Sequence, residues 1–345
     1  MMQSKTPHIQ LGKHNCQSQQ GGFTILELLI AMTMFAIVTG AAFGLMEVAR
    51  SDRFTTNQRV ETMQNVRAAL NAIGRDALNA GFGYSNIGGQ LPDDSLATLL
   101  GLPADTDTSL DRLTPVVAGN NITANTLSGI NTDQLTFVFQ DESFNNGTTL
   151  SIDEIIPPSG QLRIRDPGTN AVCRINDLYI ITGQNASAIG MATNMSANNK
   201  IVFAASDPLN INQPGASSPL SNVTAPASVS RISWVTYRVL NDGTLVRTVY
   251  GNSATALQDM PLAYGIRDMQ VQYVLVDGTI SDDPGAGPDL TAGTADDTPS
   301  NFGNVRQVRV TINARSPEID RRTNQPFQVT LTSTFNTRNI GYDAR

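Results

Sequence analysis

The stretch that decides the architecture is residues 21–40, GGFTILELLIAMTMFAIVTG. From Phe23 to Met46 the only charged residue is Glu27. As a helix at 1.5 Å per residue, this segment extends roughly 36 Å, enough to cross a bilayer. A carboxylate inside such a span costs roughly 3 kcal/mol or more, so Glu27 requires a compensating partner.

The twenty residues before this stretch are polar and weakly basic, with Lys5 and Lys13. They contain no apolar core, which excludes an ordinary secretory signal peptide. The two lysines predict that this leader lies on the cytoplasmic side and that the chain after the apolar stretch lies outside.

The composition excludes several classes of enzyme and binding protein. Both histidines lie in the leader, and the chain after Gly22 retains one cysteine, Cys173, and one lysine, Lys200. Nucleophilic triads and zinc sites are therefore not expected in a processed chain. The formal net charge is −7, and it becomes −9 when Lys5 and Lys13 leave with the leader, so nucleic-acid binding is not expected.

The second half of the helix is predicted to be amphipathic and to run to residue 79. Its apolar residues recur at spacings of three and four, and Gly81 follows as a stop signal. These residues are expected to pack on a globular head: Val60, Met63, Val66, Leu70, Ile73 and Ala77.

The rest of the chain predicts a β-rich head, and the fold class is therefore α+β. Short strands are expected at 134–139, 161–165, 177–182 and 200–203, and a polar loop at 204–228. The segment from 229 onward alternates with period two and has a strong turn signal at Asp242-Gly243. It predicts an antiparallel meander of about five strands with one face receiving the helix.

We therefore divide the chain into four expected segments. They are a leader (1–22), the helix (23–79, membrane part 23–46 and amphipathic part 47–79), a β-rich insert (80–228) and an antiparallel β-sheet head (229–345).

The Gly-Gly pair followed by FTILELLIAMTMFAIV resembles the class III leader and N-terminal helix of type IV pilins and type II secretion pseudopilins. The resemblance implies that a prepilin peptidase cuts between Gly22 and Phe23 and that the new amino group of Phe23 is methylated. It also implies that Glu27 pairs with the N-terminal amine of a neighbouring subunit. An alternative from the residues alone is a Glu27 carboxylate in the first helical turn that reaches the membrane interface.

The order of long helix, β-insert, hairpin and final strand pair is similar to PilW minor pilins and J-type minor pseudopilins. The resemblance implies the type IV pilin fold and no enzymatic activity. It implies a minor pilin that takes part in pilus assembly or initiation near the filament tip. Expected partners are major and minor pilins, the prepilin peptidase, the inner-membrane assembly platform and a tip adhesin.

The resemblance also implies a location: a single pass through the bacterial inner membrane with the head in the periplasm, then the extracellular pilus. Two alternatives stay open at this point. The first is a minor pseudopilin of a type II secretion system. The second is a membrane-tethered periplasmic hydrolase with paired carboxylates, for which a glycine-rich loop offers poor geometry.

One loop suggests a metal ion. Residues 277–301 contain six aspartates and four glycines but no basic residue. Flexible carboxylates suit the oxygen coordination of calcium, although a solvated acidic loop has the same composition. The candidate ligands are Asp282, Asp283, Asp289, Asp296 and Asp297.

Overall fold

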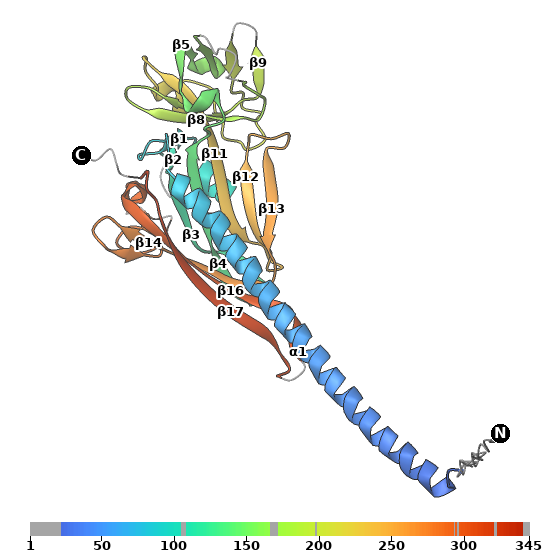
Figure 1. Ribbon diagram of the computed structural model, residues 1–345. Coiled ribbons are helices and arrows are strands. Elements are labelled where there is room, and N and C mark those ends of the chain that lie inside the picture. The colour runs from blue at the N-terminus through green and yellow to red at the C-terminus, as the bar shows by residue number, and fades with distance from the viewer. Residues whose placement is uncertain are drawn as a thin grey trace, which may run out of the picture. The chain divides into compact units, whose positions relative to one another are not determined.

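The computed structural model describes residues 22–104, 108–165, 172–196, 199–292, 294, 297–320 and 323–340. The chain begins with one long helix, α1 (Ile25–Asn79), and continues as a head built mainly of β-strands (Figure 1). The head, from Thr56 onward, is one compact unit that includes the second half of α1. This arrangement agrees with the predicted α+β class.

The helix α1 ends at Asn79, the residue predicted from the sequence, and begins at Ile25, two residues after the predicted start. The helix contains no proline, and it stops where Gly81 adopts a left-handed backbone angle of 78°. In that conformation the Gly81 amide donates to the carbonyl of Val138, 2.9 Å away, so the chain leaves the helix already joined to the sheet.

The buried stripe of α1 begins later than the sequence pattern suggested. Val60 is 47% exposed, so its predicted place in the core is wrong, whereas Thr62 and Asp76 are buried. The apolar spacing alone could not reveal that polar side chains share this stripe. The buried residues are Thr62, Val66, Ala69, Leu70, Ile73, Gly74, Asp76 and Ala77.

The head contains short and long strands, most of them antiparallel. Its first part comprises β1 (Gly89–Leu91), α2 (Ser95–Leu100), β2 (Asp111–Leu113), β3 (Val116–Asn125), β4 (Ile130–Gln140), β5 (Leu150–Ile156), β6 (Gln161–Ile164), β7 (Leu178–Thr182), β8 (Ser187–Met191), β9 (Asn194–Ser196) and β10 (Lys200–Val202). Its second part comprises β11 (Ser228–Val239), β12 (Leu245–Tyr250), β13 (Leu257–Ala263), β14 (Ile266–Leu275), β15 (Ile280–Ser281), β16 (Val305–Asp320) and β17 (Gln325–Asn336).

Strand β11 links the two ends of the head. Its first residues, Ser228–Arg231, pair with β5 and β7, whereas Ile232–Val239 pair with β4 and β12. The predicted hairpin at Asp242-Gly243 is confirmed, because β11 and β12 pair across it and Gly243 has a backbone angle φ of 80°.

The predicted single meander is wrong. β11 and β12 belong to one sheet with β3, β4 and β13, whereas β14, β15, β16 and β17 form a separate four-stranded sheet. Gly265, with φ of 72°, lies between β13 and β14, where the chain passes from one sheet to the other. Period-two alternation predicts strands, but it carries no information about which strands pair.

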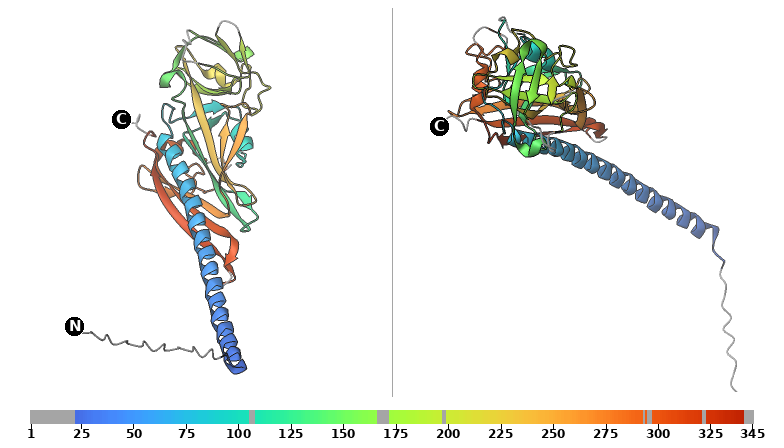
Figure 2. Two further views of the ribbon diagram at one scale, coloured as in Figure 1. Left: turned by 45° about the vertical axis from the view of Figure 1, so that its right-hand side comes forward. Right: turned by 90° about the horizontal axis from the view of Figure 1, so that it is seen from above.

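The second half of α1 packs against both sheets. Asp76 contacts β11 and β12 by accepting from the Tyr237 hydroxyl and Arg247 Nε, each 2.7 Å away. Gly74 lies against β17, where a Cβ would stand 2.5 Å from the Phe335 ring. Figure 2 shows the C-terminal strands beside this part of the helix in both views. One hydrophobic core cluster of the head therefore lies between α1 and the two sheets, and two further clusters lie among the other strands.

A buried carboxylate joins the two sheets directly. Asp133 of β4 is 2% exposed and accepts from the amides of Asn121 (2.8 Å) and Val271 of β14 (2.7 Å). Nearby, the Asn125 side chain donates to the carbonyl of Ile266. Burial raises the pKa of Asp133 to about 6, although the two amide donors oppose that shift.

This raised pKa predicts a pH-dependent contribution to stability. The pKa of Asp133 is near 4 in the unfolded chain and about 6 in the folded head. Between these two pH values the folded head binds more protons than the unfolded chain does, so its stability falls as the pH rises from about 4 to about 6. For Asp133→Asn, which does not titrate, the destabilisation relative to wild type should be larger at pH 4.5 than at pH 7.5, by about 2 kcal/mol. Urea unfolding of both proteins at the two pH values measures this difference, and an equal loss at both would contradict the prediction.

Candidate functional site

The predicted processing site lies just before α1. Gly22 and Phe23 are exposed and outside the helix, and the Phe23 side chain is 89% exposed. A Cβ at Gly22 would meet nothing within 4 Å. No residue that the structure describes therefore covers the Gly22 Cα.

Glu27 is held at the helix start by a reciprocal capping box with Thr24. The Thr24 amide and hydroxyl donate to Glu27 Oε2, at 3.0 and 3.1 Å, and the Glu27 amide donates to Thr24 Oγ1 at 3.2 Å. A Thr and a Glu three residues apart satisfy two amides of the first helical turn in this way. The carboxylate is thus fixed one turn from Phe23, close to where a cleaved chain carries its new amine.

Thr24 was not among the residues predicted for this site, although the sequence contains a signal for it. The spacing Thr-x-x-Glu immediately before an apolar run is the sequence pattern of a capping box. The structure therefore adds Thr24 to Gly22, Phe23 and Glu27 as a fourth residue of this N-terminal site.

After this site the helix presents apolar side chains to its surroundings. Residues 25–46 carry exposed leucine, isoleucine, methionine and phenylalanine, with Phe35 at 73%. Among the described residues, α1 is the one helix long and apolar enough to cross a membrane, and none of its most apolar window is buried in the protein. An apolar surface that the protein itself leaves uncovered is what a membrane or a bundle of similar helices would cover.

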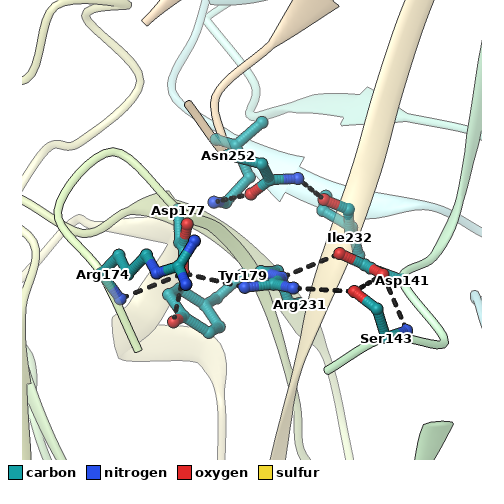
Figure 3. A network of polar contacts seen from close by, with 9 residues as sticks. Asp141, Ser143, Arg174, Asp177, Tyr179, Arg231, Ile232 and Asn252 are labelled. Atoms are coloured by element: carbon teal, nitrogen blue, oxygen red, sulfur yellow. Dashed lines mark hydrogen bonds and ion pairs between the residues drawn. The ribbon is translucent and has the colours of Figure 1, made fainter. Parts of the chain in front are cut away.

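The head contains a second polar constellation that sequence analysis missed (Figure 3). The Arg231 guanidinium donates to Asp141 (2.9 Å), Asp177 (3.3 Å) and the Ser143 hydroxyl (3.0 Å), and it lies 5.2 Å from the centre of the Phe144 ring. These contacts bring the segment after β4, the segment before β7 and β11 together. No spacing in the sequence connects residues so far apart.

The Arg231 network links three segments of the head. Burial raises the pKa of Asp177, while Arg231 opposes that shift. Burial also raises the pKa of the nearby Cys173 thiol, which disfavours the thiolate that nucleophilic chemistry requires. The Cys173 thiol beside this network is therefore not an activated nucleophile.

The aspartates proposed as calcium ligands make mostly local contacts. Asp283 and Asp289 accept from the backbone amides of Gly285 (3.0 Å) and Thr291 (2.8 Å), and Asp282 accepts from the Gln272 side chain (3.2 Å). The contacts of Asp283 and Asp289 are turn contacts that solvated loops make without a metal. That of Asp282 joins the loop to β14.

Two of these aspartates, Asp283 and Asp297, line a cavity of about 750 Å³ that α2 and β3 also border. Asp296 lies outside the described residues. Within the part of the chain that the structure describes, no group of three or more His, Cys, Asp or Glu side chains is arranged to hold a metal ion. The calcium site therefore stays a prediction.

Its test is thermal unfolding of a soluble head that begins near residue 50. If calcium binds the folded loop, millimolar calcium should raise the melting temperature, because a ligand that binds only the folded state stabilises it. A chelator should reverse the rise. A melting temperature that is the same with calcium and with chelator would remove the hypothesis.

In a comparison with known families, residues 17–43 match the prokaryotic N-terminal methylation motif. The leader motif indicates a type IV pilin-like protein. A search of curated proteins finds no match. The matched segment contains Gly22, Phe23, Thr24 and Glu27, the four residues that the structure brings to the start of α1.

The leader motif implies processing by a prepilin peptidase and assembly with pilus components. The leader and the apolar first half of α1 fit membrane anchoring and a pilus-type location. The long helix followed by a β-rich head fits a pilin-like α+β fold. Such proteins are structural and usually lack enzymatic activity.

Proposed function

We propose that this chain is a minor pilin that takes part in the assembly or initiation of a type IV pilus, at or near the filament tip. The observation that carries the proposal is the N-terminal site, in which Gly22, Phe23, Thr24 and Glu27 combine the methylation motif with a capped, otherwise uncovered apolar helix. In the filament, this helix would pack among the helices of the other subunits.

The size of the head supports the low-abundance role. The compact unit begins at Thr56. Other strands pair with both ends of β11, and a second sheet lies beside α1. A head of this bulk is difficult to repeat at every position of a helical lattice, whereas at the end of a filament one side is open. We therefore propose that this chain lies at or near the tip of the filament.

Within this function, Glu27 is proposed to pair with the methylated amine of Phe23 of a neighbouring subunit. Two opposite charges that enter an apolar helix bundle stabilise it only when they meet, since either charge alone would pay the full desolvation penalty. The capping box would keep the carboxylate at the helix start, where an incoming amine can reach it.

The test is to locate the chain in filaments sheared from its native host. We expect a mature chain that begins with methylated Phe23, present at far lower abundance than the main subunit and labelled by antibody at filament ends. Labelling along the whole length would overturn the tip position. Recovery only in secretion pseudopili would favour the pseudopilin alternative.

Processing itself gives a further prediction at Gly22. A bulky side chain in Gly22→Leu should block cleavage, because the peptidase must accept the residue before the scissile bond, whereas the small side chain of Gly22→Ala should be tolerated. Intact mass of the membrane-extracted chain distinguishes the two. Normal cleavage of Gly22→Leu, or an uncleaved wild-type chain, would contradict the assignment of the scissile bond.

A further inference from the structure

Strand β17 has an open edge. Among the described residues it pairs only with β16, and it ends the order β15-β14-β16-β17. Its 12 residues, QPFQVTLTSTFN, include no charged residue, and its only proline, Pro326, stands at the start. A long strand edge of this kind presents a row of unpaired amides and carbonyls to any extended chain that approaches it.

The register identifies which groups point outward. The Thr337 amide donates to the carbonyl of Arg306, 2.9 Å away, in the continuation of the β16–β17 ladder. Because narrow and wide pairs alternate in an antiparallel ladder, residues 329, 331, 333 and 335 bond to β16, and the residues between them turn their backbone groups to the open edge. Those outward residues are Gln328, Thr330, Thr332, Thr334 and Asn336.

Two other long strands of the described head also have a single partner, β3 with β4 and β13 with β12. β3 shifts register between Gly119 and Thr123, and β13 carries Asp259 and Pro261 and shifts register beside Pro261. A charge, a proline and a bulge are the features by which proteins prevent unwanted strand pairing at an edge. β3 and β13 each have such a feature, whereas β17 from Phe327 onward has none of them.

The direction of β17 restricts its partner. Phe327 lies near Arg59 of α1, and Asn339, just after the strand, donates to the carbonyl of Leu78 at the helix end. β17 therefore runs in the same direction as the second half of α1. In a filament whose helices point the same way, a neighbouring strand that runs opposite to its own helix would meet β17 in the antiparallel sense.

We propose that the open edge of β17 is a docking site for an edge strand of a different pilin-type subunit, which extends the β14–β17 sheet by β-strand addition. This inference rests on the proposed function, because it takes the common direction of the helices from a filament. The partner strand should be uncharged and should alternate, since Val329, Leu331 and Phe335 face the helix while the threonines face outward.

A second copy of this chain is a poor partner. Two copies of β17 related by a twofold axis would pair antiparallel only with their helices pointing in opposite directions, which a common membrane anchor prevents. Among the described residues, the long strands with one partner that run opposite to α1 are β3 and β13. The register shift between Gly119 and Thr123 interrupts the edge of β3, and Asp259, Pro261 and a second shift interrupt that of β13. The geometry therefore favours a heterotypic contact.

The test uses the full-length chain in its native host and the variant Thr332→Pro. Proline removes the outward amide of Thr332 without removing a bond to β16, so folding should persist. Thr332→Val is the matched control, because both variants lose the hydroxyl contact with Thr311 (2.9 Å) but valine keeps the amide. We expect processing to be normal in both, and filament-associated Thr332→Pro to fall about tenfold or more below Thr332→Val.

A photo-crosslinking residue at Thr330, with the same residue at Asp259 as control, identifies the occupant without relying on the proline variant. An adduct with another pilin-type subunit at Thr330, absent at Asp259, supports the proposal. Equal incorporation of Thr332→Pro and Thr332→Val, an adduct with a second copy, or no adduct at Thr330 in filaments that contain the wild type would overturn it. Absence of the wild type from filaments would instead refute the proposed function.

Discussion

Glu27→Ala should be processed and inserted normally but should largely fail to enter filaments. Peptidase cleavage depends on the residues beside the scissile bond, so loss of this carboxylate leaves it intact. In the filament, the amine that faces Glu27 would enter an apolar bundle without its counter-charge. Removing one partner of a buried pair costs roughly 3 to 5 kcal/mol, enough to abolish stable docking.

Because Glu27 also caps its own helix, two further variants separate the roles. Glu27→Gln keeps an acceptor for the Thr24 amide but removes the charge, whereas Thr24→Val removes the hydroxyl of the capping box and keeps the charge. If charge pairing governs assembly, Glu27→Gln should behave as Glu27→Ala does. Thr24→Val should assemble nearly as the wild type does, because losing a cap costs only about 1 kcal/mol.

The measurement is the amount of mature chain in sheared filaments relative to membranes, with filament number counted in parallel. Normal incorporation of Glu27→Ala would show that the carboxylate is only an interfacial charge. A first subunit has no earlier amine to neutralise, so a milder defect is expected if the chain occupies the extreme tip.

Asp76→Ala should destabilise the head more than any surface substitution. Asp76 is 3% exposed on α1 and accepts from the Tyr237 hydroxyl and Arg247 Nε. Its loss leaves the guanidinium of Arg247, whose side chain is 17% exposed, without its partner, and leaves a buried hydroxyl unpaired. We expect the free energy of unfolding of the head to fall by about 3 to 5 kcal/mol.

Arg75→Ala is the matched control for this helix position. The Arg75 side chain is 71% exposed and 3.8 Å from Asp76, so its ion pair is screened by solvent and its loss should change stability by less than about 1 kcal/mol. The double variant Asp76→Leu with Arg247→Met should recover part of the loss, since neither charge remains. Denaturant unfolding of the soluble head measures all three, and a similar loss in Asp76→Ala and Arg75→Ala would refute the role assigned to the buried pair.

The N-terminal site illustrates what local sequence can decide. Gly22, Phe23 and Glu27 stand within six residues, and a short local pattern is enough to recognise the methylation motif that contains them. The end of α1 could be predicted for the same reason, because helical periodicity, the absence of proline and the Gly81 stop are local signals. The capping role of Thr24 could also have been predicted, because its spacing of three residues from Glu27 is a local pattern.

The contacts of the head depended on residues far apart in the chain. Aspartate is usually exposed in proteins, yet Asp76 is part of the core because it accepts hydrogen bonds from Tyr237 and Arg247. Asp133 of β4 joins two sheets because it accepts from the Asn121 amide of β3 in its own sheet and from the Val271 amide of β14 in the other. Arg231 contacts Asp141 and Asp177, which come from segments that no sequence spacing relates.

Sequence by itself determined the leader, the long helix, the α+β class and the positions of most strands, because each depends on periodicity or turn chemistry within a few residues. Only the tertiary structure decided that the expected meander divides into two sheets, that α1 packs against both, and that β17 has an unguarded edge. Strand pairing is a competition among all alternating segments, and its outcome depends on packing across the core, which no single segment encodes.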